Sequence, residues 1–372
     1  MNHFSEVTRL FSMEGATHLY SSPPSMLTPA DLYHVKDNPA HRAALAGCNI
    51  YLIVRRQRIY LNPEILSRNG RVVSGEFLVL REHGMTRVPF TYEICLPTIS
   101  SGLEILDIRL APNGSAMVVV TPEGGQMIAV NVIVAGAQSE LMPDDTDMEV
   151  LYVGQSIGQA NSLTALDRLL SHTKFQQILA ENSTHSPERE ILLLLCRFEH
   201  GRTIISNGGD FNVEAQATDA QDSAHFDRLR EVRLKRHEVV SLAEAALINY
   251  FKPYYNTLLK KTNFAASEKL KVLKQLMKKG ITGLVVELCS ANLRSRLGTR
   301  DAIPNELEDW FSEEVIQGRN IEELEIKQQW QEELKVIGHS HWARFALTTN
   351  HERNTFLHGT KFMGQTDKAW TW

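Results

Sequence analysis

The stretch MEVLYVGQSIGQANSLTALDRLLSH, from Met148 to His172, brings together four residue types that are common in active sites. Its first half alternates as a β-strand does and presents Tyr152 just before Gly154. Its second half has helical spacing, which predicts that Arg168 and His172 lie one turn apart on one face. Arginine forms paired hydrogen bonds with phosphate oxygens, and histidine exchanges protons near neutral pH. These residue types suit chemistry on a phosphate group.

A carboxylate follows in a second stretch, SLAEAALINYFKPYYN, from Ser241 to Asn256. The apolar spacing predicts a helix, which Pro253 ends. Ser241 followed three residues later by Glu244 is a capping-box pattern, in which the carboxylate binds the first turn of the helix. Considered alone, this motif favours the structural role for Glu244.

Several other elements must hold these two stretches in place. Short alternating apolar runs, separated by turn signals such as Asn69-Gly70 and Asn113-Gly114, predict a β-rich N-terminal domain over residues 1–125. The order of the next elements, β-β-α-β-α, predicts a compact α+β domain over residues 126–258. Residues 259–372 are expected to be mixed but mainly helical, with acidic helices that pack on their own domain or on a second copy in a homodimer.

Composition narrows the class of protein. The chain has 372 residues, 43% of them hydrophobic, so it can bury a sizeable core. Its formal net charge is -5, so contact with nucleic acid must come from local basic stretches. Four widely spaced cysteines form no CxxC pair, and no apolar run is long enough to cross a bilayer. We therefore expect a cytoplasmic protein that does not contact a membrane.

Taken together, the two stretches resemble the GIY-YIG nuclease superfamily, most closely the N-terminal nuclease domain of bacterial excision-repair endonucleases. The family pattern is a strand with Y-(I/V)-G, a helix with arginine and, one turn on, histidine or tyrosine, and a helix with E-x-x-L-I followed by K-P-x-(Y/F)-N. The matching residues are Tyr152-Val153-Gly154, Arg168, His172, Glu244, Leu247-Ile248, Lys252-Pro253, Tyr255 and Asn256. The resemblance covers roughly residues 126–258.

Two positions differ from the family pattern. The first motif, G-I-Y, is expected on the strand before Tyr152, but MIAVNVIVAG contains no tyrosine, and Asn131 is the only polar residue in its apolar run. The lysine that often follows Y-(I/V)-G in the excision-repair proteins is replaced by Gln155.

The resemblance implies a metal-dependent endonuclease that hydrolyses phosphodiester bonds in nucleic acid, with DNA favoured over RNA. Restriction, phage defence or a mobile element would each fit. By this resemblance Glu244 binds Mg²⁺ or Mn²⁺ and Arg168 holds phosphate oxygens. Tyr152 orients or deprotonates the attacking water or holds the scissile phosphate, with His172 as the other candidate. The residues expected around the substrate are Gly154, Gln155, Lys252 and Asn256.

A non-catalytic binding module that has kept the fold is the alternative. Each of Tyr152, Arg168 and His172 has an ordinary structural role when considered singly, and only their joint order with Glu244 favours the nuclease. The basic stretches at Asp227–Glu238 and 260–279 are expected to contact phosphates, or to be solvated helix faces.

Overall fold

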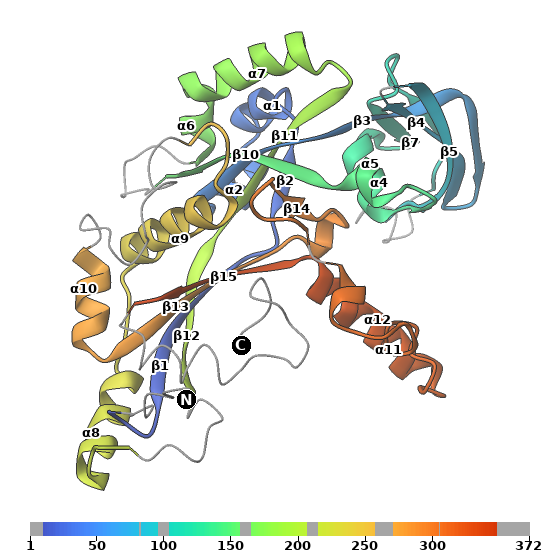
Figure 1. Cartoon of the computed structure of the whole chain (residues 1–372). Helices are drawn as coiled ribbons and strands as arrows, with labels where there is room; N and C mark the ends of the chain where they lie inside the picture. Colours follow the sequence, from blue (N-terminus) through green and yellow to red (C-terminus); the bar gives the residue numbers. More distant parts are fainter. Residues whose placement is uncertain are drawn as a thin grey trace.

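The computed structural model describes residues 10–81, 83–95, 104–156, 165–206, 215–256, 271–304 and 306–347. It is a mixed α+β structure, as the sequence predicts (Figure 1). No helix in these ranges has the length and apolar character that a membrane span requires.

Strand β3 (Ile50–Asn69) organises the molecule, because it runs from the helix-covered body into a small β-rich lobe (Figure 1). Its first half pairs antiparallel with β10 (Met148–Gln155) on one side and with β11 (Arg189–Cys196) on the other. At the sheet's margins, β2 (Ser25–Leu27) pairs with β11, and β14 (Leu297–Gly298) pairs with the start of β10. The central strand of this sheet therefore comes from the predicted N-terminal domain.

Side chains of β3 alternate between two apolar layers. Ile50 and Leu52 pack in the same hydrophobic cluster as helix α9 (Arg236–Phe251), and Tyr51 and Ile53 pack in a second cluster on the opposite face. The helices of that second layer are α1 (Asp31–Asp37), α2 (Pro39–Leu45), α6 (Ala165–Leu170) and α7 (Thr173–His185). The sheet is thus covered by helices on both faces.

A second sheet packs against the α9 layer and joins distant parts of the chain. Its strands are, in spatial order, β12 (Phe198–Ser206), β1 (Glu14–Ser21), β13 (Ile281–Cys289) and β15 (Ser340–Ala346). Strand β1 pairs antiparallel with β12 and parallel with β13. Strands from all three predicted domains therefore share one sheet, and positions 125 and 258 do not divide the described residues into separate units.

The remaining elements of the body flank these sheets. Helix α8 precedes α9 in the chain, and α10 packs on β13. One of the acidic helices expected within residues 259–372 is present as α12. Their bounds are α8 (Asp219–Arg230), α10 (Lys271–Lys278), η2 (Ala291–Leu293), η3 (Leu307–Asp309), α11 (Glu313–Ile316) and α12 (Leu324–Gly338).

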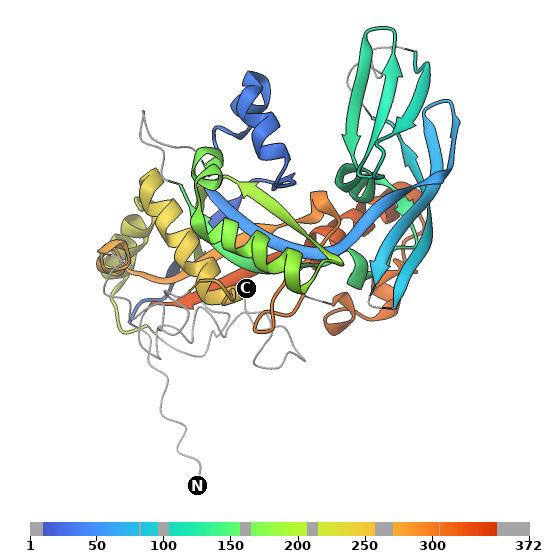
Figure 2. The same ribbon diagram turned by 90° about the horizontal axis from the view of Figure 1, so that it is seen from above.

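The second half of β3 and the chain up to β10 form the lobe, which has its own hydrophobic core around Phe77 and Phe90. Figure 2 shows it beside the body, attached through β3. The lobe elements are β4 (Val72–Arg81), β5 (Gly84–Glu93), β6 (Asp107–Leu110), β7 (Ala116–Thr121), β8 (Gly124–Ala129), α4 (Val130–Gly136), β9 (Gln138–Ser139) and α5 (Pro143–Thr146).

The strand predicted just before Tyr152 was wrong. The run MIAVNVIVAG forms the end of β8 and the whole of α4, because a short apolar run fits a buried helix as well as a strand. Asn131 is buried in the lobe, where its side chain accepts a hydrogen bond from Arg56. It takes no part in the sheet that carries Tyr152.

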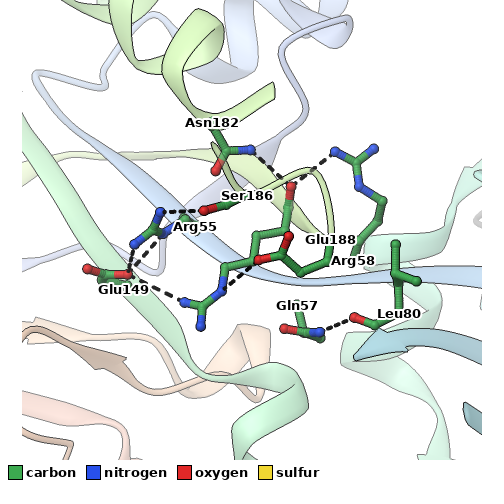
Figure 3. A network of polar contacts seen from close by, with 9 residues as sticks. Arg55, Gln57, Arg58, Leu80, Glu149, Asn182, Ser186 and Glu188 are labelled. Carbon is green, nitrogen blue, oxygen red and sulfur yellow. Dashed lines mark hydrogen bonds and ion pairs between the residues drawn. The ribbon is translucent and has the colours of Figure 1, made fainter. Parts of the chain in front are cut away.

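A network of charged and polar side chains fixes the point at which β3 leaves the body (Figure 3). Arg55 on β3 donates to Glu149 on β10 at 2.7 Å, and Arg189 on β11 lies 3.6 Å from the same carboxylate. Arg58 and Asn182 both donate to the Arg189 carbonyl oxygen at 3.0 Å. These contacts hold the three central strands in register beside the lobe.

Candidate active site

Tyr51 and Gly154 lie directly opposite each other where β3 pairs with β10. Tyr51 is completely buried, and its ring lies across the Gly154 backbone. A Cβ at position 154 would be 2.4 Å from Tyr51 Cζ and 2.5 Å from its hydroxyl oxygen. Gly154 therefore makes room for a tyrosine of the same protein, whereas the resemblance implied close approach of substrate.

Tyr152 faces the same layer as Tyr51 because β10 contains a β-bulge. The pairing with β3 shifts register between Val150 and Tyr152, which leaves Leu151 as the extra residue. Leu151 and Tyr152 consequently both pack in the α6–α7 layer, which regular alternation would not allow. The Tyr51 and Tyr152 ring centroids lie 6.2 Å apart.

Arg168 and His172 do not share one continuous helix, which corrects the prediction. Helix α6 ends at Leu170, and His172 is the extended N-cap of α7. The turn between them is closed by the N–H of His172, which donates to the Leu169 carbonyl oxygen at 3.2 Å. His172 nevertheless contacts the tyrosines, with ring centroids 5.9 Å from Tyr51 and 5.2 Å from Tyr152.

The capping bond determines which nitrogen of His172 carries the proton. His172 Nδ1 accepts the Phe175 backbone N–H at 3.3 Å, so the neutral ring has its proton on Nε2. Burial, and then the positive charges of Arg168 and Lys174, lower the pKa of His172. Neutral His172 can therefore donate a hydrogen bond through Nε2, and it is poorly suited to accept a proton there.

Glu244 lies in the interior of α9 and does not form its cap. The capping box is made by Lys235 and Glu238, since the Glu238 carboxylate accepts the Lys235 backbone N–H at 2.7 Å. Burial raises the pKa of Glu244 to about 7, and the Arg168 charge acts in the opposite direction. The capping role that the local motif favoured for Glu244 is therefore wrong.

The charges of Glu244 and Arg168 affect the pKa values of the two tyrosines. The charge of Glu244 raises the pKa of Tyr152 and of Tyr51, although burial is the larger cause at both tyrosines, and Arg168 lowers both pKa values. The Tyr51 hydroxyl is buried and makes no well-formed hydrogen bond to a residue that the structure describes, although Tyr152 and Arg168 are near enough to affect its pKa. Both phenols are consequently protonated near neutral pH.

Asn256 holds β10 from its outer side. Its side chain accepts the Val153 N–H and donates to the Val153 carbonyl oxygen, both at 2.9 Å. Both ends of the amide are engaged in these bonds, so Asn256 braces the strand, whereas the resemblance placed it around the substrate. It fixes the backbone between Tyr152 and Gly154.

Lys252 lies apart from this cluster. It is the C-cap of α9, and its Nζ is 3.4 Å from Asp301 on the surface. At about 1.5 Å of rise per helical residue, Lys252 is roughly 12 Å beyond Glu244 along the axis. The structure thus brings together Tyr152, Gly154, Gln155, Arg168, His172, Glu244 and Asn256, but not Lys252.

Tyr51 was not among the site residues predicted from the sequence. Its signal was present as Asn49-Ile50-Tyr51 at the head of a long alternating run, but the whole lobe separates it from Tyr152 in the chain. Asn49 itself is buried and links strands, because its carbonyl oxygen accepts the Ser156 N–H at 2.8 Å.

The donor set suits a cation that is bound mainly by water. In the part of the chain that the structure describes, no three His, Cys, Asp or Glu side chains gather closely enough to hold a metal ion. Mg²⁺ is commonly bound through one or two carboxylates while it keeps several waters. Glu244, a half-buried carboxylate among phenols and an arginine, fits that mode of binding.

No protein-family model, curated protein or solved structure matches this chain. Its function must therefore be inferred from its own residues.

We expect Gly154→Ala to lower the free energy of unfolding by about 1–3 kcal/mol, because the new methyl group overlaps the Tyr51 ring. Urea denaturation measures the change. Gly47→Ala is the control, since its Cβ would meet only the flexible Arg197 side chain, at 3.2 Å. Equal stability of the Gly154→Ala variant and the wild type would contradict the close packing of Tyr51 on Gly154.

Proposed function

We propose that this protein is a GIY-YIG-type endonuclease that hydrolyses phosphodiester bonds, in DNA rather than RNA, with Mg²⁺ or Mn²⁺. The observation that carries the proposal is the meeting of five side chains at the Gly154 end of β10: Tyr51, Tyr152, Arg168, His172 and Glu244. Asn49-Ile50-Tyr51 supplies the tyrosine of the first motif, with asparagine in place of glycine.

The order of elements supports the same proposal once the lobe is set aside. Strands β3 and β10, helices α6 and α7, strand β11 and helix α9 then follow the β-β-α-β-α order of the family, with the pair α6 and α7 in place of one helix and with β12 and α8 as additions between β11 and α9. The lobe is an insertion between the two tyrosine-bearing strands.

Each residue has a distinct part in the proposed hydrolysis. Arg168 is exposed on α6 and would bind the scissile phosphate with two N–H groups, which neutralises charge as the fifth oxygen approaches phosphorus. The phenols of Tyr51 and Tyr152 are protonated, so they would orient the attacking water and the phosphate oxygens by hydrogen bonds, and the attacking water would lose its proton to bulk water as the new P–O bond forms. His172 Nε2–H would donate to a phosphate oxygen. A divalent cation on Glu244 would stabilise the charge of the leaving oxygen.

An exposed group of lysines and arginines on α8 and α9, on and just after α10, and in the segment between α8 and α9 would supply a surface for the phosphate backbone. Arg236 in this group contacts the chain shortly before Tyr51, because it donates a hydrogen bond to the carbonyl oxygen of Gly47 at 3.4 Å. We call the following residues the basic surface: Arg230, Arg233, Lys235, Arg236, Lys271, Lys274, Lys278 and Lys279. None of them forms an ion pair with a residue that the structure describes. The other part of the predicted basic stretch, 260–270, is outside the described residues.

Replacing Arg168 by lysine tests the proposal directly. Lysine keeps the charge but cannot form the paired hydrogen bonds, so we expect a loss of about 1–3 kcal/mol of transition-state stabilisation, or roughly 5- to 150-fold in rate. The measurement is cleavage of plasmid and oligonucleotide DNA and of RNA with Mg²⁺ or Mn²⁺. Arg197→Lys, in an exposed pair with Glu199, is the control. Absence of cleavage by the wild type on every substrate would favour the binding module.

Nucleic-acid binding should weaken steeply with salt, because it depends on a local basic surface in a protein of net charge -5. We expect at least roughly tenfold weaker binding at 200 mM than at 50 mM salt. Changing Lys274 and Lys278 to glutamine should reduce this salt dependence, which fluorescence anisotropy measures. Lys335→Gln on α12 is the control and should leave it unchanged. Binding that does not respond to salt would exclude the basic surface.

A further inference from the structure

Gln155 is the last residue of β10, and its side chain lies on the α9 side of the sheet. The alternation along this end of β10 explains the position: Tyr152 packs in the α6–α7 layer, Val153 in the α9 cluster, and Gly154 under the Tyr51 ring. Gln155 is therefore next to Glu244, which α9 presents at the same place.

Glu244 determines the orientation of the Gln155 amide. The backbone N–H and the side-chain amide of Gln155 both interact with the Glu244 carboxylate as hydrogen-bond donors. An ionised carboxylate can only accept, so the atom that faces it must be the amide nitrogen, Nε2. The carbonyl oxygen, Oε1, consequently takes no part in that bond.

Gln155 Oε1 is buried and has no hydrogen-bond partner among the residues that the structure describes. Buried carbonyl oxygens in proteins are normally paired, so an exception beside a partly buried carboxylate calls for an explanation in terms of function. Amide and carboxylate oxygens are both hard ligands, the kind that Mg²⁺ and Mn²⁺ prefer.

We infer that Gln155 Oε1 contacts the divalent cation that Glu244 binds, so that the cation has two side-chain oxygen ligands. This inference rests on the proposed function, and specifically on Glu244 as a metal ligand. In this role Gln155 acts twice: its N–H groups hold the Glu244 carboxylate in place, and its carbonyl oxygen completes the binding site. A lysine at this position could not supply the second contact, because it has no acceptor.

The deciding experiment is Mn²⁺ binding to Gln155→Glu, without nucleic acid, followed by the EPR signal of free Mn²⁺. If the side-chain oxygen contacts the cation, the added negative charge should tighten binding by roughly tenfold, because ligand charge increases affinity. If Gln155 only holds Glu244 in place, the same change removes the hydrogen-bond donor and sets a second carboxylate against that of Glu244. Mn²⁺ binding should then weaken. The control is Gln176→Glu, which adds the same charge at an exposed position on α7.

The outcomes separate the inference from the proposed function. Tighter binding by Gln155→Glu, with Gln176→Glu unchanged, supports the inference. Unchanged or weaker binding by Gln155→Glu, or equal tightening by Gln176→Glu, overturns it and leaves the proposed function standing if Glu244→Gln still abolishes Mn²⁺ binding. If the wild type binds Mn²⁺ no better than Glu244→Gln, both fail.

A measurement on the wild type covers the case in which Gln155→Glu does not fold. With glutamine side-chain amides labelled with ¹⁵N, pulsed EPR of bound Mn²⁺ should detect coupling to a labelled nitrogen, since Nε2 is two bonds from the coordinating oxygen. Absence of that coupling in protein that binds Mn²⁺ overturns the inference.

Discussion

Glu244→Gln is expected to reduce cleavage by at least roughly 100-fold while nucleic-acid binding persists. Glutamine keeps the shape of the side chain but removes the charge that would hold the cation. Because burial already raises the pKa of Glu244 to about 7, loss of this partly buried charge should leave stability unchanged or slightly higher. Cleavage rates, DNA affinity and thermal unfolding of the same preparations measure the three effects.

Helix α9 provides a matched control for this experiment. Glu238→Gln removes the same charge from the same helix, at the position that forms the cap. It should leave cleavage close to the wild-type rate, since glutamine also serves in a capping box. Equal cleavage by Glu244→Gln and Glu238→Gln would refute the role of Glu244 as a metal ligand.

Tyr51→Phe is expected to reduce cleavage by at least roughly 100-fold without any loss of stability. The hydroxyl is buried and makes no well-formed hydrogen bond within the described part of the chain, so its removal deletes a desolvated polar group and keeps the ring that packs on Gly154. The free energy of unfolding should therefore stay the same or increase, while the orientation of water and phosphate is lost.

Tyr92→Phe makes the same chemical change in the lobe core and should leave cleavage unchanged. The comparison distinguishes a catalytic phenol from a core aromatic residue. A Tyr51→Phe variant that cleaves at the wild-type rate would remove Tyr51 from the mechanism, and a variant that is less stable would point to a structural hydrogen bond.

The spacing of residues within each short stretch was sufficient to predict the elements that carry neighbouring parts of the candidate site. The helix around Glu244 and the strand around Tyr152 are both present, and Asn256 lies beside that strand. The break between Arg168 and His172 was not predictable from helical spacing, because it depends on the histidine ring acting as the cap of the next helix.

Long-range pairing was beyond the reach of the sequence patterns. Tyr51 was assigned to a separate N-terminal domain, because nothing in a run of alternating residues specifies its partner strand. The bulge at Leu151, which turns Tyr152 toward Tyr51, also arises from pairing with β3 and has no local sequence signal. The capping-box pattern at Ser241 predicted the wrong start for the helix, because the helix begins earlier, at Arg236.

The insertion of the lobe between β3 and β10 has a consequence for the order of folding. Pairing Tyr51 with Gly154 closes a very long loop, and the entropy cost of closure rises with loop length. A lobe that has already folded on its own core brings the two strand ends together and removes most of that cost. A lobe that folds first would then favour the pairing of β3 with β10 on which the candidate active site depends.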